Sequence, residues 1–169
     1  MTFFRSSILF LFFYSAVAFS HGPTRQKVKE TIEIKSTSVE VWRMIKNLDS
    51  AEVWHAEYSS LSSDNGMKKF ISKRDGSNGL IEILSSNNDR MKFKYRLKNP
   101  ASIPVNNYSA QVSVTSNGDD SKVTFKGAFY RKYVNNDPPP GEDDDAAIRA
   151  ITEIYKNSLK QLKITIEEK

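Results

Sequence analysis

The side chains that carry most enzyme chemistry are scarce in this chain of 169 residues. There is no cysteine, which excludes a thiol nucleophile, a thiolate metal centre and a disulfide from this sequence. A triad of serine, histidine and acid needs a histidine, and only His21 and His55 are present. We therefore predict no cofactor and no metal site. His55, acting as a general base, is the one candidate for a catalytic residue.

His55 follows Trp54 in the segment 51–58, which we expect to form a second short helix or a turn. Because an imidazole titrates near neutral pH, His55 could accept a proton or hydrogen-bond a ligand. In the alternative interpretation, His55 packs beside Trp54 and bonds a backbone carbonyl. The sequence leaves both interpretations open.

Two charged residues in strand-like segments, Glu82 and Arg131, could hold the polar part of a ligand. Glu82 lies in a segment with apolar residues on both faces, so the face that meets the interior stays open. Arg131 shares a strand face with Phe125, Gly127 and Phe129. If Glu82 and Arg131 face one cavity, they would pair or bind a polar head group. Otherwise each reaches solvent at a strand end.

Three aromatic residues, Tyr95, Tyr108 and Phe129, fall on apolar strand faces and could line a pocket. Tyrosine hydroxyls would then give an apolar ligand a few fixed polar contacts, although ordinary core packing explains the same pattern. Gly127, among bulky strand residues, predicts a bulge or a bend.

A basic stripe, Arg90, Lys92, Lys94 and Arg96, alternates with Met91, Phe93, Tyr95 and Leu97. The stripe is either a docking surface for an acidic partner or an ordinary solvent face that also discourages edge pairing. The whole chain has 25 Lys and Arg against 20 Asp and Glu, a net charge of +5. We expect no nucleic-acid partner, because the chain carries an export signal.

That signal occupies residues 1–20, where Arg5 precedes an apolar run and small residues follow. We predict a secreted or periplasmic protein, cut after Ser20. The alternative, a retained anchor, needs a run of about 20 apolar residues, longer than this one. Residues 21–169 then form a single domain without a membrane span.

Hydrophobic periodicity places the candidate residues on a sheet that is followed by one long helix. Strands are predicted at 28–34, 58–61, 68–73, 80–84, 90–97, 108–115 and 122–133, with turn residues between most of them. A short helix begins near Thr37, with Glu40 three residues on as a capping box. A helix over 144–168 carries an apolar stripe of Ile148, Ile151, Tyr155, Leu159, Leu162 and Ile166.

This order of elements resembles the helix-grip fold of the SRPBCC superfamily, which includes START-like, Bet v 1-like and polyketide-cyclase-like proteins. The resemblance implies an α+β fold class, with a curved antiparallel sheet of about six to seven strands, two short helices and one long C-terminal helix. Short blocks carry a closer resemblance to an exported bacterial branch that includes the MxaD-type proteins of periplasmic methanol oxidation. These blocks are His21–Thr24, Val41-Trp42, Trp54-His55, Pro104–Ser109, Gly127–Arg131 and Pro138–Asp144.

The resemblance implies an apolar cavity between the sheet and the C-terminal helix. We predict that it binds a hydrophobic or aromatic small molecule without catalysis, and the candidate contacts are Trp54, His55, Glu82, Tyr95, Tyr108, Phe129 and Arg131. One alternative is an accessory protein that docks through the basic stripe to an acidic partner, a periplasmic quinoprotein dehydrogenase or its cytochrome. Another is a cyclase- or dehydrase-like enzyme that uses His55 as base.

Overall fold

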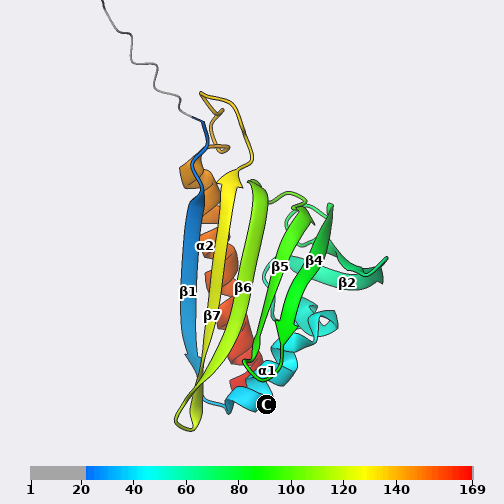
Figure 1. Cartoon of the computed structure of the whole chain (residues 1–169), viewed down its shortest axis with the longest axis vertical. Helices are drawn as coiled ribbons and strands as arrows, with labels where there is room; N and C mark the ends of the chain where they lie inside the picture. The colour runs from blue at the N-terminus through cyan, green and yellow to red at the C-terminus, as the bar shows by residue number, and fades with distance from the viewer. Residues whose placement is uncertain (1–21, 169) are drawn as a thin grey trace, which may run out of the picture.

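The strands of this protein form one antiparallel sheet in the order β1-β7-β6-β5-β4-β3-β2 (Figure 1). The computed structural model describes residues 22–168. The strands are β1 (Gln26–Ile34), β2 (Tyr58–Asp64), β3 (Met67–Ser72), β4 (Asn78–Asn87), β5 (Lys92–Asn99), β6 (Val105–Asn117) and β7 (Asp120–Arg131). The helices are α1 (Ser38–Lys46), the 3-10 helix η1 (Leu48–Val53) and α2 (Asp144–Glu167).

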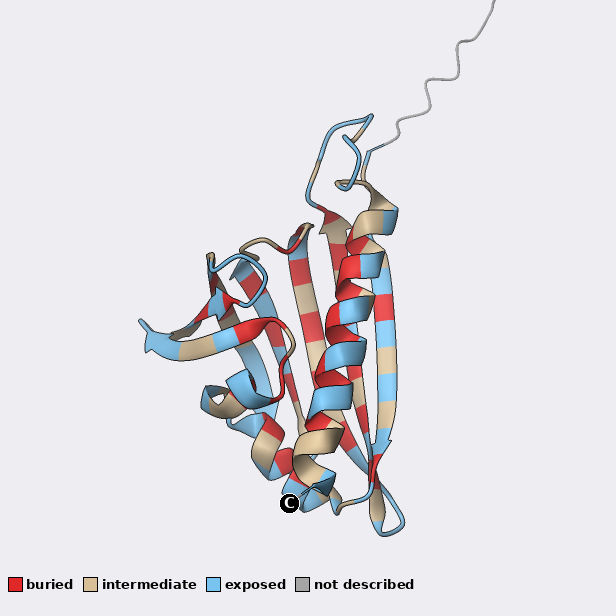
Figure 2. Ribbon diagram, turned by 180° about the vertical axis from the view of Figure 1, so that it is seen from behind, coloured by how far each residue is buried: buried red, intermediate tan, exposed pale blue. Residues whose placement is uncertain are grey.

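The helices cover only one face of the sheet, which we call the inner face. The sheet curves around α2, which packs on β1 and β7, and α1 packs on β6 and β7 (Figure 2). The opposite, outer face carries no helix in the described part of the chain (Figure 1). This arrangement confirms the predicted helix-grip fold. None of the described helices is long and apolar enough to cross a bilayer.

Both α-helices begin where the sequence places a capping side chain. Thr37 is the N-cap of α1 and accepts from the Glu40 amide at 3.4 Å, as the capping box predicts. Asp143 is the N-cap of α2 and accepts from the Ala146 amide at 2.6 Å. Asp144 and Asp145 follow in the first turn, where carboxylates stabilise the positive end of the helix dipole.

The core forms where the strands' alternating apolar residues meet the helix stripe. Along β7, Val123, Phe125 and Phe129 are buried while Lys122 and Lys126 are exposed. On α2 the predicted stripe is buried at its four central positions, Ile151, Tyr155, Leu159 and Leu162. Removal of this apolar surface from water supplies most of the stabilisation.

Three local predictions need correction. Arg90 lies outside β5, because Met91 has a positive φ of 43° and completes the turn that precedes the strand. Helical geometry covers 48–53 rather than 51–58. The irregularity predicted at Gly127 occurs in the neighbouring strand, where the β6–β7 register shifts between Asn106 and Ser109.

The predicted signal segment 1–20 and His21 lie outside the described residues.

Candidate functional site

A small cavity lies between the inner face of the sheet and the segment that links η1 to β2. The sheet contributes Ile81, Phe93, Tyr95, Val112 and Phe125, the linking segment contributes Trp54 and His55, and Leu48 of η1 and Tyr58 at the start of β2 complete the lining. The volume open to the centre of a water-sized sphere is about 10 Å³. That is close to the least space that holds one water molecule. The cavity is therefore nearly filled by its own walls.

Helix α2 contributes no residue to this lining within the described chain, which differs from the predicted cavity between sheet and C-terminal helix. The reason is Tyr155, which fills the space beneath α2. Its ring meets Phe125 edge-on, with centroids 5.3 Å apart. A Cβ at position 127 would lie 2.2 Å from the Tyr155 hydroxyl oxygen, so Gly127 is what allows the tyrosine to reach the sheet.

Three buried tyrosines form a chain of hydroxyl groups from the cavity wall to α2. The Tyr95 and Tyr108 oxygens are 3.1 Å apart, and those of Tyr108 and Tyr155 are 2.6 Å apart. Burial raises the pKa of Tyr95, and it raises the pKa of Tyr108 and of Tyr155 well above the ordinary value. The hydroxyls therefore stay protonated at physiological pH, and the chain can donate and accept hydrogen bonds without carrying charge.

His55 is buried and stacked on Tyr58, with ring centroids 3.7 Å apart and planes 4° apart. Its Nδ1 accepts the backbone N–H of Glu57 at 3.2 Å, so the ring proton must be on Nε2. Burial, followed by the charge of Lys73, lowers the pKa of His55 to about 3. The imidazole is thus neutral, with its basic nitrogen already occupied, an arrangement that suits packing better than proton abstraction.

Trp54 is 1% exposed, and its indole N–H has no hydrogen-bond partner among the described residues. The ring packs edge-on against Phe125, with centroids 6.2 Å apart. An unsatisfied buried donor costs about 1–3 kcal/mol. The indole N–H of Trp54 is therefore a polar group of a cavity-lining residue for which an added hydrogen-bond acceptor would be favourable.

A few polar contacts hold the segment 54–57 in place. The Ala56 amide donates to the Ser158 hydroxyl on α2 at 2.9 Å. On the other side, the Lys73 ammonium donates to the carbonyl oxygens of Glu52 and His55 at 2.9 and 3.0 Å. The cavity's outer wall is thus attached to α2 by one side-chain hydrogen bond and to the end of β3 by a partly solvated lysine.

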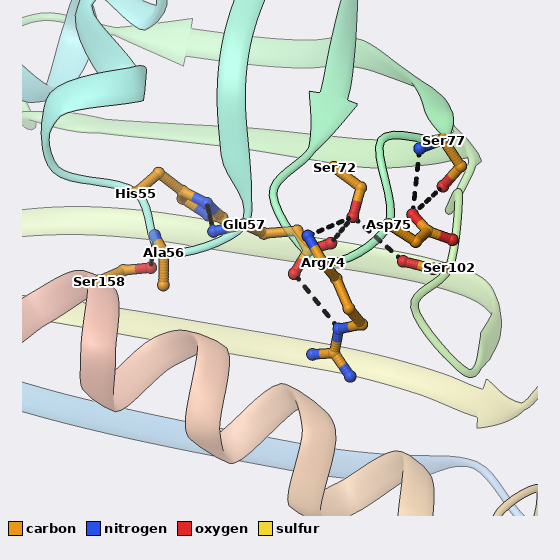
Figure 3. A network of polar contacts seen from close by, with 9 residues as sticks. All are labelled: His55, Ala56, Glu57, Ser72, Arg74, Asp75, Ser77, Ser102 and Ser158. Carbon is orange, nitrogen blue, oxygen red and sulfur yellow. Dashed lines mark hydrogen bonds and ion pairs between the residues drawn. The ribbon is translucent and has the colours of Figure 1, made fainter.

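A polar network beside this wall joins the segment before β2 to the end of β3 and to the β3–β4 and β5–β6 loops (Figure 3). The buried Glu57 carboxylate accepts from the Ser72 hydroxyl and lies 3.7 Å from the Arg74 Nε. The Ser72 oxygen is also 3.1 Å from the Ser102 hydroxyl. In the β3–β4 loop the hydroxyl and amide of Ser77 donate to the Asp75 carboxylate. These hydrogen bonds lower the pKa of the Asp75 carboxyl. The network fixes the loops at this end of the sheet.

Glu82 and Arg131 do not meet, and each has other partners. Glu82 alternates with the cavity residue Ile81, so it lies on the outer face, where it accepts from Arg96 Nε at 2.6 Å. Arg131 donates to the carbonyl oxygens of Tyr133 and Asn135 at 2.8 and 2.9 Å. Its Nη1 lies 3.4 Å from Asp144. Arg131 therefore connects the loop after β7 to the start of α2.

The predicted contact residues are thus only partly gathered at the cavity. Trp54, His55 and Tyr95 line it, and Tyr108 touches it through the Tyr95 hydroxyl. Phe129 is buried and stacks on Tyr108 at 6.2 Å, away from the lining. A ligand-binding role for any of these residues stays a prediction.

Sequence reasoning missed three residues that shape the site: Glu57, Tyr58 and Tyr155. The helix stripe marked Tyr155 as buried, and the signal for its hydroxyl contact was Gly127, a small residue among bulky ones. The positions of Tyr58 and His55, three apart, gave no sign that their rings would stack. No pattern marks Glu57 as a buried carboxylate.

Comparison with known proteins agrees with this architecture. The family model described as "polyketide cyclase / dehydrase and lipid transport" matches residues 25–167. The solved structure of XoxI from Bacillus cereus is 22% identical with a TM-score of 0.71, covering 82% of this chain and 94% of that one. The ZhuI aromatase/cyclase from Streptomyces sp. R1128 is 12% identical with a TM-score of 0.66, covering 86% and 95%.

A START superfamily protein from Mycobacterium smegmatis is 11% identical, with a TM-score of 0.66 and coverage of 84% of this chain and 97% of that one. At such identities the likeness shows a shared fold. No curated protein sequence matches the chain.

Proposed function

This chain belongs to the polyketide cyclase / dehydrase and lipid transport family, and from that membership we propose that it binds a small hydrophobic or aromatic molecule without transforming it. The family description names chemistry on polyketides and transport of lipids. Both kinds of molecule offer large apolar surfaces, and a pocket with aromatic walls and few polar groups suits such ligands.

The observation that carries the proposal is the composition of the cavity wall. Six of its nine lining residues have aromatic rings, counting the neutral His55, and the other three, Leu48, Ile81 and Val112, are aliphatic. The unsatisfied Trp54 N–H adds one fixed donor. The preferred ligand therefore combines an aromatic or aliphatic body with a single acceptor, such as a carbonyl oxygen.

Binding requires the cavity to enlarge, since about 10 Å³ does not admit an organic ring. The wall best placed to move is the η1–β2 segment, because the opposite wall consists of sheet strands that are hydrogen-bonded on both sides. The contacts that must yield are the Ala56–Ser158 hydrogen bond and those of Lys73. Ligand binding would thus displace His55 and Trp54 together.

The proposal can be tested with two nearly isosteric probes, acetophenone and ethylbenzene, of which only the ketone carries an acceptor. The chain has two tryptophans, so the variants Trp42→Phe and Trp54→Phe assign the two indole N–H signals in an NMR spectrum. We expect acetophenone to shift the Trp54 signal and to bind more tightly than ethylbenzene. The Trp42 signal, whose N–H already donates to Asn88, serves as internal control.

In the Trp54→Phe variant the preference for the ketone should disappear while binding of ethylbenzene persists. Native mass spectrometry of protein taken from its own cells supplies an independent readout, as a mass increment lost on denaturation. The proposal fails if neither probe shifts signals of the cavity residues and the cell-derived protein carries no small molecule.

The enzymatic alternative, with His55 as general base, has less support. The Nδ1 of His55 already accepts from the Glu57 amide. Glu82 binds Arg96 on the outer face and Arg131 binds the loop after β7, so neither is placed to assist His55. The docking alternative depends on the exposed basic residues of the outer face, Lys94 and Arg96 among them.

We also propose that the protein is exported and that residues 1–20 are removed, because a positive n-region, an apolar run and small residues follow in order. N-terminal sequencing of protein from fractionated cells tests this. A mature chain that begins at His21 supports it, and recovery of the intact N-terminus in the cytoplasm contradicts it.

A further inference from the structure

The outer face of the sheet carries lysines in transverse register across neighbouring strands. Lys94 on β5 is paired with Gln111 on β6, Gln111 with Lys126 on β7, and Lys126 with Lys29 on β1. Neighbouring strands are about 4.8 Å apart, so this row spans roughly 14 Å. Three of its four side chains are cationic and exposed. We call it the lysine row.

The next row of outer-face residues lies two positions along each strand and forms a flatter surface beside the lysines. It runs through Arg96, Ser109, Ala128 and Lys27, with small side chains at its centre and cations at its ends. Lys27, Lys94 and Lys126 surround an open hollow of about 530 Å³, whose floor includes Ser109 and Ala128. The lysines that line the hollow belong to the outer face, which no helix of the described residues covers (Figure 1).

The charges of the lysine row are not neutralised within the fold. None of Lys29, Lys94 and Lys126 forms an ion pair among residues 22–168. The acids on this face are placed elsewhere, since Glu82 pairs with Arg96 and Lys98, and Glu33 lies opposite Lys122. Lys29 directly opposite Lys126 is a like-charge pair, which weakens a sheet. Packing gives no reason for this row.

We propose that the lysine row and its hollow dock the protein on an anionic lipid membrane, with the lysines contacting lipid phosphates. Lysine is depleted at the centres of protein–protein interfaces, where aromatic and arginine anchors dominate. Along the lysine row there is no such anchor. Lysines near an anionic bilayer, by contrast, each contribute to binding with little demand on geometry. This inference is independent of the cavity, because it concerns the opposite face of the sheet.

The test is co-sedimentation of the proposed mature chain, residues 21–169, with vesicles of phosphatidylcholine, with and without phosphatidylglycerol. A variant with Lys29→Gln, Lys94→Gln and Lys126→Gln removes the row and also its like-charge pair, so it should fold at least as well as the parent. The matched control changes three exposed helical lysines, Lys46→Gln, Lys156→Gln and Lys160→Gln. Both variants lose the same net charge.

We expect the parent to bind only vesicles that contain phosphatidylglycerol, and high salt to release it. Each lysine near an anionic bilayer contributes about fivefold, so the row variant should bind roughly 100-fold more weakly, while the control stays within about fivefold of the parent. Equal loss in both variants, or no binding by the parent at low salt, overturns the proposal. Retention on immobilised polyglutamate without vesicle binding would instead assign the face to an acidic protein.

Discussion

The two faces of the sheet are built from alternate residues of the same strands, yet they follow different physical rules. On β7 the inner residues Phe125, Gly127 and Phe129 are buried, and each fits a neighbour closely. The outer residues Lys122 and Lys126 project from a surface that no described helix covers. On this strand the inner residues are fixed by close packing, whereas the outer lysines carry charges that solvent can reach.

This difference separates what stabilises the protein from what remains for function. The close fit on the inner face leaves about 10 Å³ of free space, so a ligand there must displace part of the wall. The outer face includes an unfavourable pair, Lys29 opposite Lys126, which stability alone would not select. The proposed ligand binding on the inner face therefore requires movement, whereas the proposed docking on the outer face requires none.

The largest expected contrast is between two adjacent residues of β7, one on each face. Phe125→Ala should lower the free energy of unfolding by about 3–5 kcal/mol, because it removes a buried ring that contacts both Trp54 and Tyr155. Lys126→Ala should change it by less than about 0.5 kcal/mol. Urea unfolding at neutral pH measures both. Similar losses in the two variants would contradict the division between the faces.

A second contrast concerns the close approach at Gly127. Gly127→Ala should cost about 1–3 kcal/mol, because the added Cβ overlaps the Tyr155 hydroxyl oxygen. In a Tyr155→Phe background, which lacks that oxygen, the same substitution should cost clearly less. A double-mutant cycle measures the coupling. If the two substitutions are additive, the tyrosine is not what requires a glycine here.

A third prediction concerns acid stability and arises from His55 on the inner side. Since burial lowers the pKa of His55 to about 3, its folded form stays neutral while the unfolded chain takes up a proton near pH 6.5. Stability present above pH 6.5 is therefore lost as the pH falls, by up to about 1.4 kcal/mol for each unit. Urea titrations between pH 7 and 5 should show this slope in the parent, and His55→Asn should remove it. Parallel slopes in the two proteins would show that His55 titrates normally.

The smallest expected effect is on the outer face. Lys126→Glu places opposite charges across from Lys29 and should raise the unfolding free energy by about 0.2–1 kcal/mol. The matched change, Lys122→Glu, creates a like-charge pair with Glu33 and should lower it by a similar amount. The two shifts, measured by urea unfolding at low salt, should both shrink at high salt. Equal signs would contradict the register of the lysine row.

Local sequence patterns predicted the strands and helices, because the interactions that form each element involve residues close together in the chain. Alternation along β7 and the stripe on α2 depend on which residues must leave water, and Thr37 and Asp143 bond amides three residues away. The same alternation predicted that Tyr95, Tyr108 and Phe129 would be buried. It could not predict that Glu82 would meet Arg96 rather than Arg131, since pairing across strands depends on register shifts in β4.

Residue type and spacing were enough to predict the sheet, the long helix, the basic outer residues and the scarcity of catalytic groups. The position of the free space, by contrast, depends on contacts between residues far apart in the chain. Gly127 and Tyr155 are 28 positions apart in the printed chain, and their contact closes the space under α2 and leaves the remaining cavity beside Trp54. The folded sheet also brings Lys29, Lys94 and Lys126 into one row. Their alignment depends on the pairing register of β1, β5, β6 and β7, which no local sequence pattern specifies.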